Sequence, residues 1–219
     1  MIARDHAPCR VVVLISGSGS NLQSLIDASS QPDARFKIAA VLSNKPDAFG
    51  LTRARNAGIV TQSISHTAFG SREQFDNSLA DAIDQHQPDL VVLAGFMRIL
   101  TPGFTARFSG RMLNIHPSLL PKYPGLNTHQ RALDAGDTEA GATIHFVTAD
   151  LDGGPPVIQA RVPIKPGDNA ASLAKRVLER EHQIYPLAVS WFAEKRLRMH
   201  DQHAWLDDAL IPIDGIPFN

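Results

Sequence analysis

The chain contains a single cysteine, Cys9, among its 219 residues. Without a second cysteine, no internal disulfide framework can hold the fold, and a reducing, cytoplasmic setting is the simplest expectation. Long apolar runs are also lacking, and no stretch approaches the roughly 20 residues that a membrane span requires. The first apolar run, VVVLI at 11–15, is expected to be too short for the hydrophobic region of a secretory signal.

An excess of charge of either sign is lacking as well. The 21 Lys and Arg and the 22 Asp and Glu give a formal net charge of −1. We therefore expect no general attraction to nucleic acid or to an anionic membrane, and small molecules as partners. A content of 43% hydrophobic and 20% charged residues suits one soluble domain over residues 1–219.

Apolar, β-branched runs alternate with helical patterns through the first half of the chain. The runs that predict strands lie at 10–15, 36–42, 89–96 and 111–115, and those that predict helices lie at 21–28, 50–58 and 71–86. This alternation predicts an α/β fold with a Rossmann-like, open and mostly parallel sheet and helices on both faces. Further along, two extended segments at 141–147 and 155–164 precede a long helix at about 169–195.

A glycine-containing loop, SGSGSN at 16–21, follows the first predicted strand and opens the first predicted helix. The dinucleotide-binding fingerprint requires a third glycine where Leu22 stands, and no Gly-Lys-Ser/Thr follows to make a Walker motif. What remains is a short polar loop at a helix N-terminus, which can bind a single phosphate through the backbone N–H groups of Gly19, Ser20 and Asn21. The alternative is a tight turn without a ligand.

A second motif, LNIHPSLLPKYPG at 113–125, places Asn114 and His116 at the end of a predicted parallel strand. Two residues apart in an extended chain, they point to the same side, and ligands bind at the carboxyl ends of such strands. An amide and an imidazolium can together stabilise an oxyanion formed from a carbonyl. A carboxylate would orient the imidazole and favour its charged form, and the segment ADLDGG offers Asp150 and Asp152.

Other interpretations of these histidines stay open. His116 could be an ordinary surface or capped histidine, and His145, inside an apolar run, is expected to be packed and hydrogen-bonded. A metal site is not expected, since the chain has no H-E-x-x-H, no C-x-x-C and no clustered histidines.

Six segments occur in an order that resembles a known family. They are VVLISGSGSNLQ, LSNKPDAFGL, VVLAGFMRIL, LNIHPSLLPKYPG, HFVTADLDGG and EHQIYPLAVSWF. Together they resemble the phosphoribosylglycinamide formyltransferases, folate-dependent enzymes of purine synthesis, over about residues 10–206. The combination of Asn, His and Asp is typical of the wider superfamily that uses 10-formyltetrahydrofolate. The last 13 or so residues show no firm resemblance.

The resemblance implies that the amine of 5-phosphoribosylglycinamide attacks the formyl carbon of 10-formyltetrahydrofolate, which serves as co-substrate without a metal. By position, His116 would be the proton donor, Asn114 the second donor to the oxyanion, and Asp152 the partner that keeps His116 charged. Asp150 then becomes the less favoured partner.

The resemblance also implies an N-terminal half that binds the nucleotide phosphate and a C-terminal half with the folate site and catalytic loop. The nucleotide residues would be Gly19, Ser20, Asn21 and Glu181. The folate residues would be Arg72, Met97, Arg98, Ile99, Leu100, Asn114, Thr148, Ala149, Asp150, Leu151 and Asp152. Ser18 departs from the asparagine expected in close relatives.

Three alternatives were weighed against this interpretation. A methionyl-tRNA formyltransferase is expected to have a further tRNA-binding domain, and a formyltetrahydrofolate hydrolase an additional N-terminal domain. A folate- or nucleotide-binding module without catalysis would not need Asn114, His116 and Asp152 together. We expect a monomer or a weak homodimer.

Overall fold

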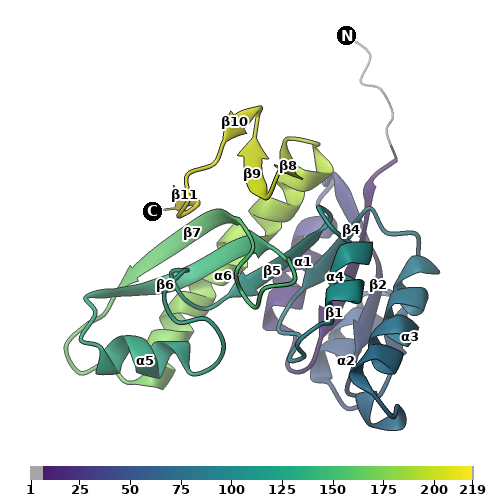
Figure 1. The fold of residues 1–219 in the computed structure, drawn as a ribbon, viewed down its shortest axis with the longest axis horizontal. Coiled ribbons are helices and arrows are strands. Elements are labelled where there is room, and N and C mark those ends of the chain that lie inside the picture. Colours follow the sequence, from purple (N-terminus) through teal and green to yellow (C-terminus); the bar gives the residue numbers. More distant parts are fainter. Residues whose placement is uncertain (1–6, 219) are drawn as a thin grey trace.

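The computed structural model describes residues 7–218, and an eight-stranded sheet runs through both halves of that range (Figure 1). The strand order is β11-β7-β6-β5-β4-β1-β2-β3. Its strands are β1 (Cys9–Ile15), β2 (Phe36–Ser43), β3 (Thr61–Ser63), β4 (Leu90–Leu93), β5 (Met112–His116), β6 (Glu139–Phe146), β7 (Pro156–Pro163) and β11 (Ile216–Phe218). A small second sheet holds β8 (Leu197–His200), β9 (His203–Leu206) and β10 (Ala209–Leu210).

The five neighbouring strands β5, β4, β1, β2 and β3 are parallel, as the alternating pattern predicts. β6 is antiparallel to β5, and β7 is antiparallel to β6. No helix lies between β6 and β7 in the described chain, so these two strands form an antiparallel pair joined by a loop. The open, mostly parallel sheet is therefore confirmed. The segment that lacked any resemblance supplies β11, which pairs in parallel with β7.

The helices are α1 (Ser20–Ser29), α2 (Phe49–Asn56), α3 (Arg72–Asp84), α4 (Pro102–Arg107), α5 (Thr128–Asp134) and α6 (Ala170–Ala193), with a 3₁₀ turn, η1 (His66–Ala68). α3 lies within the range predicted at 71–86, and Ser71 caps its first turn by accepting a hydrogen bond from the Gln74 N–H. Asn169 caps α6 with a capping box. α4 and α5 were not predicted, since each is too short to show a period.

The apolar residues of β1 are divided between two cores. Val11, Val13 and Ile15 pack on the side of α1, α2 and α6, whereas Val12 and Leu14 pack on the side of α3 and α4. Because successive side chains of a strand point to opposite faces, a strand covered on both sides must be apolar throughout. The prediction of helices on both faces is thus confirmed for this part of the sheet.

β5 differs from β1 in having one polar face. Asn114 lies opposite His145 on β6, His116 lies opposite Thr143, and Thr143 lies opposite Gln159 on β7. Leu113 and Ile115 of β5 point to the other face and join the core beneath α6. This row of polar side chains across β5, β6 and β7 is called the polar face below, and it positions the candidate site.

Candidate active site

An open cleft of about 750 Å³ lies at the carboxyl ends of β4 and β5. A smaller hollow of about 90 Å³ adjoins it, between the segments 96–100 and 147–152. The two share Asn114 and Asp152 in their linings. Of the predicted folate residues, these line one or both spaces: Met97, Arg98, Ile99, Leu100, Asn114, Thr148, Ala149, Asp150, Leu151 and Asp152. The structure therefore brings together segments that are about fifty residues apart in the sequence.

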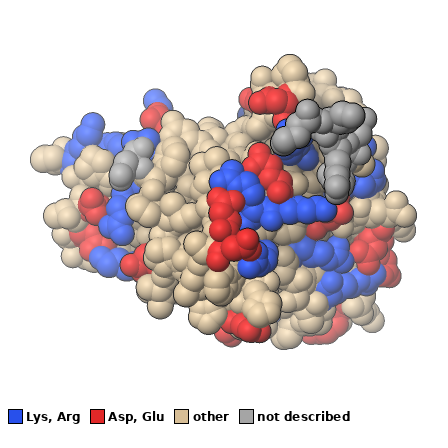
Figure 2. Space-filling model, turned by 90° about the horizontal axis from the view of Figure 1, so that it is seen from above, with Lys and Arg blue, Asp and Glu red and all other residues tan. Residues whose placement is uncertain are grey.

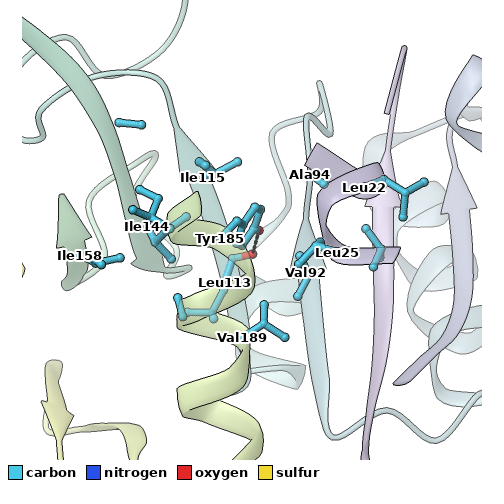
Figure 3. Close-up of a cluster of buried hydrophobic side chains, with 14 of the residues drawn as sticks. Leu22, Leu25, Val92, Ala94, Leu113, Ile115, Ile144, Ile158, Tyr185 and Val189 are labelled. Atoms are coloured by element: carbon cyan, nitrogen blue, oxygen red, sulfur yellow. Dashed lines mark hydrogen bonds between the residues drawn. The ribbon is translucent and has the colours of Figure 1, made fainter. Parts of the chain in front are cut away.

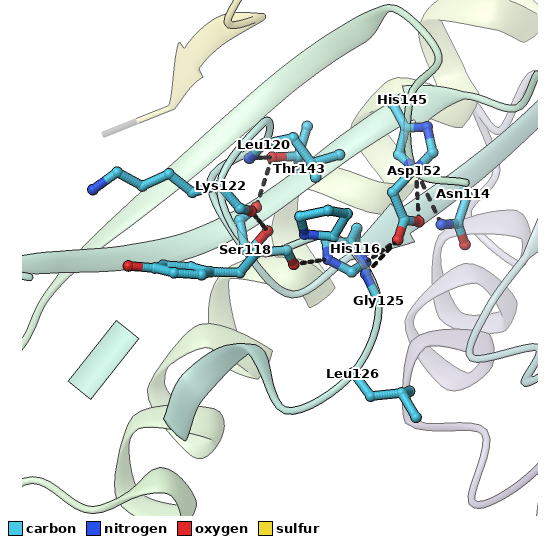
Figure 4. Close-up of polar contacts among 12 residues, drawn as sticks. Asn114, His116, Ser118, Leu120, Lys122, Gly125, Leu126, Thr143, His145 and Asp152 are labelled. Atoms are coloured by element: carbon cyan, nitrogen blue, oxygen red, sulfur yellow. Dashed lines mark hydrogen bonds and ion pairs between the residues drawn. The ribbon is translucent and has the colours of Figure 1, made fainter. Parts of the chain in front are cut away.

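His116 is 5% exposed, and both of its ring nitrogens have partners (Figure 4). Nε2 donates to the backbone carbonyl of Tyr123 at 2.8 Å, so it carries a hydrogen, because a carbonyl can only accept. Nδ1 lies 3.3 Å from Oδ2 of Asp152. An acceptor next to each nitrogen fixes the orientation of the ring.

Asp152, rather than Asp150, is the carboxylate at His116. Its Oδ2 also accepts a hydrogen bond from the Gly125 N–H at 2.9 Å, which ties its loop to the proline-containing loop after β5. Asp150 is exposed and lines only the adjoining hollow. The choice that the sequence left open is thus decided by geometry. Gly154 of the same loop has to be glycine, because a Cβ there would lie 1.9 Å from the Phe146 carbonyl oxygen.

His145 is packed and hydrogen-bonded, as predicted, but it also contacts Asn114. Its Nδ1 donates to the Phe146 carbonyl at 2.9 Å, which leaves Nε2 to accept from Nδ2 of Asn114 at 3.0 Å. Burial lowers the pKa of His145 to about 4, against the opposing effects of the Phe146 carbonyl and the Asp152 charge. A neutral His145 therefore fixes the Asn114 amide. The antiparallel pairing of β5 with β6 was the signal that could have found this contact.

The loop after β5 is held by hydrogen bonds to the polar face. Thr143 Oγ1 donates to the Ser118 carbonyl at 2.7 Å and accepts from the Leu120 N–H at 3.1 Å. Gln159 Nε2 donates to the Leu120 carbonyl at 2.7 Å. These buried contacts fix the loop that carries the Tyr123 carbonyl, so the surroundings of His116 are largely preformed.

The glycine loop turns from β1 into α1 through Gly19, which has a φ of 71° and precedes the first helical residue, Ser20. A side chain at Gly19 would also meet Gly50, whose Cα would lie 2.6 Å from the added Cβ. Since glycine offers no side-chain cap, the first N–H groups of α1 are available to an anion. Ser18 is exposed, and its carbonyl accepts from Nε of Arg53 at 2.9 Å.

Asn21 and Glu181, which are far apart in the sequence, meet between α1 and α6. Asn21 Nδ2 donates to Oε2 of Glu181 at 2.6 Å. Burial raises the pKa of Glu181, and the hydrogen bond from Asn21 opposes that shift. Neither Asn21 nor Glu181 lines the 750 Å³ cleft.

Arg72 does not lie with the other predicted folate residues. It is the first residue of α3, it is exposed, and it lines neither the cleft nor the adjoining hollow. The first turn of α3 presents this side chain to solvent, whereas Arg98 reaches over the ring of Phe75 at 5.8 Å. Arg72 as a folate contact therefore stays a prediction.

Comparison with known proteins decides the family. The family model described as formyl transferase matches residues 9–189. The chain belongs to the formyl transferase family. This formyl transferase is 56% identical, over 94% of its length and 97% of the relative's, to the phosphoribosylglycinamide formyltransferase of Escherichia coli K12. It is 45% identical, over 89% of its length, to the human trifunctional purine biosynthetic protein adenosine-3, of which it covers 19%.

Solved structures agree with this assignment. The structure of phosphoribosylglycinamide formyltransferase from Coxiella burnetii superposes with a TM-score of 0.93 at 51% identity, covering 97% of this formyl transferase and 100% of that chain. Within residues 7–218, no three His, Cys, Asp or Glu side chains are grouped to hold a metal ion. No helix in the described part of the chain is long and apolar enough to cross a membrane.

Proposed function

We propose that this formyl transferase moves the formyl group of 10-formyltetrahydrofolate to the amine of 5-phosphoribosylglycinamide. The products are formylglycinamide ribonucleotide and tetrahydrofolate, and the reaction belongs to purine synthesis. The observation that carries the proposal is that Asn114 and His116, on the polar face of a formyl transferase fold, meet Asp152 at one cleft. Relatives that bear the name of this activity support the choice of acceptor.

The proposed step requires charge stabilisation and one proton transfer. The acceptor amine attacks the formyl carbon, and the former carbonyl oxygen becomes an oxyanion. The Asn114 amide and the His116 imidazolium offer N–H donors to that oxygen. As the intermediate collapses, the bond between the formyl carbon and N10 breaks, N10 gains a proton, and the attacking amine loses one. Asp152 stabilises the imidazolium from 3.3 Å.

His116 has to change one partner to take part in this step. Its Nε2 is bonded to the Tyr123 carbonyl, and its Nδ1 faces Asp152. A substrate oxygen would therefore replace the Tyr123 carbonyl as the acceptor for Nε2, while the contact with Asp152 is kept.

Binding of the folate is proposed at the cleft and the adjoining hollow. Apolar side chains at the cleft are exposed by 64% at Met97, 55% at Ile99, 73% at Leu126 and 55% at Leu151. Such side chains would cover a flat, partly aromatic ligand and shield the reaction from water. The acceptor phosphate is proposed at the N-terminus of α1, with Glu181 close to the acceptor amine.

Both reactants are small molecules, and we expect no nucleic acid or membrane partner. On the face shown in Figure 2, basic and acidic side chains are interspersed, which does not favour a polyanion there. A cytoplasmic monomer or weak homodimer remains our proposal, and sedimentation velocity at several concentrations would test the oligomeric state.

A formyl-transfer assay with purified enzyme tests the proposal. Tetrahydrofolate and formylated nucleotide should appear in equal amounts, and the dephosphorylated acceptor should lose most of the kcat/KM. Binding of both ligands without transfer would support a non-catalytic module. Equal reaction of the two acceptors would remove the phosphate site from the proposal, and transfer to methionyl-tRNA instead would replace the acceptor.

A further inference from the structure

α6 carries two buried polar side chains on one side of the helix. Glu181 and Tyr185 are four residues apart, so they lie one above the other. Glu181 is one of the predicted nucleotide residues, whereas the hydrogen bonds of the Tyr185 side chain go to none of the candidate site residues. It is 0% exposed and lies within the apolar core formed by the sheet and α6.

The hydroxyl of Tyr185 reaches the sheet between β4 and β5 (Figure 3). It lies 2.8 Å from the carbonyl oxygen of Leu93 and 3.1 Å from that of Leu113. Its single hydrogen is shared between the two carbonyls. Burial, and then the charge of Glu181, raise the pKa of Tyr185 well above its ordinary value, so the hydroxyl keeps the hydrogen that it donates.

The two carbonyls mark the point where the catalytic strand leaves its neighbour. Leu93 is the last residue of β4, and it is paired with Asn114 in the last register position shared by β4 and β5. Leu113 directly precedes Asn114. Beyond this position, β4 gives way to the segment 95–99, which lines the cleft. The hydroxyl therefore bridges both strands directly beneath the Asn114 backbone.

A phenylalanine would fill the same core space without placing a polar atom in it. Burying a hydroxyl is unfavourable unless it is hydrogen-bonded. The hydroxyl of Tyr185 is therefore stabilising here only through its bonds to the two carbonyls. From this geometry we propose that Tyr185 is a positioning residue for Asn114: it fixes the end of β5 against the end of β4, and so holds the amide donor in place. The proposal rests on the proposed function, in which Asn114 stabilises the oxyanion.

The positioning role predicts a specific kinetic effect. A donor displaced by a fraction of an ångström loses part of its contribution, since misplacement of about 1 Å can cost about a hundredfold in rate. We expect Tyr185→Phe to lower kcat about tenfold and to leave both KM values nearly unchanged. The matched control is Val189→Ala, one turn further along α6, at a residue that is also 0% exposed. It should lower the melting temperature while kcat stays close to the wild-type value.

The decisive arm is a double-mutant cycle with Asn114→Ala. If Tyr185 acts through Asn114, removal of the hydroxyl should have no further effect on kcat once the amide is gone. An equal loss in both backgrounds would overturn the proposal, as would an unchanged kcat in Tyr185→Phe or the same loss in Val189→Ala. The wild-type assay is read first, so a chain that transfers no formyl group fails the proposed function rather than this inference.

A second route is available if Tyr185→Phe does not fold. The chain has two tyrosines, so 3-fluorotyrosine incorporated into Tyr123→Phe protein alters the Tyr185 hydroxyl alone. Compared with unlabelled Tyr123→Phe, the labelled protein should show a changed kcat that disappears in the Asn114→Ala background. No change in either background would contradict the proposal.

Discussion

Two regions of the same sheet solve different problems. β1 is covered by helices on both faces, and Val11 to Ile15 are all 0% exposed. β5 is covered by α6 on one face only, and its polar face lies beneath the loop 117–125. A helix packed on a sheet requires apolar partners, whereas a loop has backbone donors and acceptors that polar side chains can satisfy. The chemistry is therefore found where a loop, rather than a helix, covers the sheet.

The comparison implies that substitutions in the two regions should have different consequences. Changes in the helix-covered region should lower the free energy of unfolding and leave turnover per folded molecule intact. Changes on the polar face should lower turnover, because its side chains either line the cleft or bind the loop 117–125 that surrounds His116.

The largest effect is expected from Asn114→Ala. Loss of one oxyanion donor typically lowers kcat by about 10² to 10³. Both substrates should still bind, because the cleft keeps its other lining residues. The measurement is kcat by steady-state formyl transfer, accompanied by a melting curve. A kcat near the wild-type value in a folded protein would remove Asn114 from the mechanism.

Leu79→Ala tests the other region. Leu79 of α3 is 0% exposed and belongs to the same core as Val12 and Leu14 of β1. Truncation of a buried leucine typically lowers the free energy of unfolding by about 2–5 kcal/mol, which urea unfolding measures. At a temperature where the variant is folded, kcat should stay close to the wild-type value. A loss of kcat comparable to that of Asn114→Ala would show that the two regions are not functionally distinct.

His145 should make the free energy of unfolding depend on pH. An unfolded histidine gains a proton near its ordinary pKa of 6.5, but folded His145 gains one only near 4. Because the unfolded state binds more protons in that window, the free energy of unfolding should fall as pH drops from 6.5 to 4, by about 3 kcal/mol at most.

His145→Gln should make that fall shallower, measured by urea unfolding across the same pH range. His200→Gln serves as the surface control, because the His200 side chain is 68% exposed. The same slope in His145→Gln and the wild type would mean that folding does not lower the pKa of His145.

The smallest effect is expected at the residue that departs from the family pattern. Ser18 is exposed, and only its carbonyl makes a hydrogen bond, to Arg53. Ser18→Asn should therefore change kcat/KM for the acceptor within about twofold. A larger change would place the side chain at position 18 against the nucleotide and extend the phosphate site by one residue.

The sequence predicts the fold well where periods are long and apolar. The parallel strands, the Ser71 cap of α3 and the long α6 all follow from residue spacing. β11 could not be predicted, because a three-residue edge strand has no period and depends on β7 for its hydrogen bonds.

The site was predicted in its residues but not in its contacts. Asn114 and His116 share a face because of their spacing, and the resemblance selected Asp152. The Tyr123 carbonyl at His116 and the Asn114–His145 contact depend on loop path and strand register, which spacing does not determine. Arg72 was assigned to the folate site by the resemblance alone, and it lines neither the cleft nor the adjoining hollow.

The central claim is that the charge of Asp152, in the loop between β6 and β7, acts on His116 of the polar face. The direct measurement is kcat for formyl transfer, at saturating concentrations of both substrates, in Asp152→Asn beside Asp150→Asn. Asparagine tolerates the left-handed backbone at position 152, where φ is 52°, and its side-chain oxygen can still accept from the Gly125 N–H. We predict a loss of at least about tenfold in Asp152→Asn, because acid–base catalysis typically contributes 10² to 10⁴, and little change in Asp150→Asn. Equal rates in the two variants, or an Asp152→Asn enzyme as fast as the wild type, would contradict the claim.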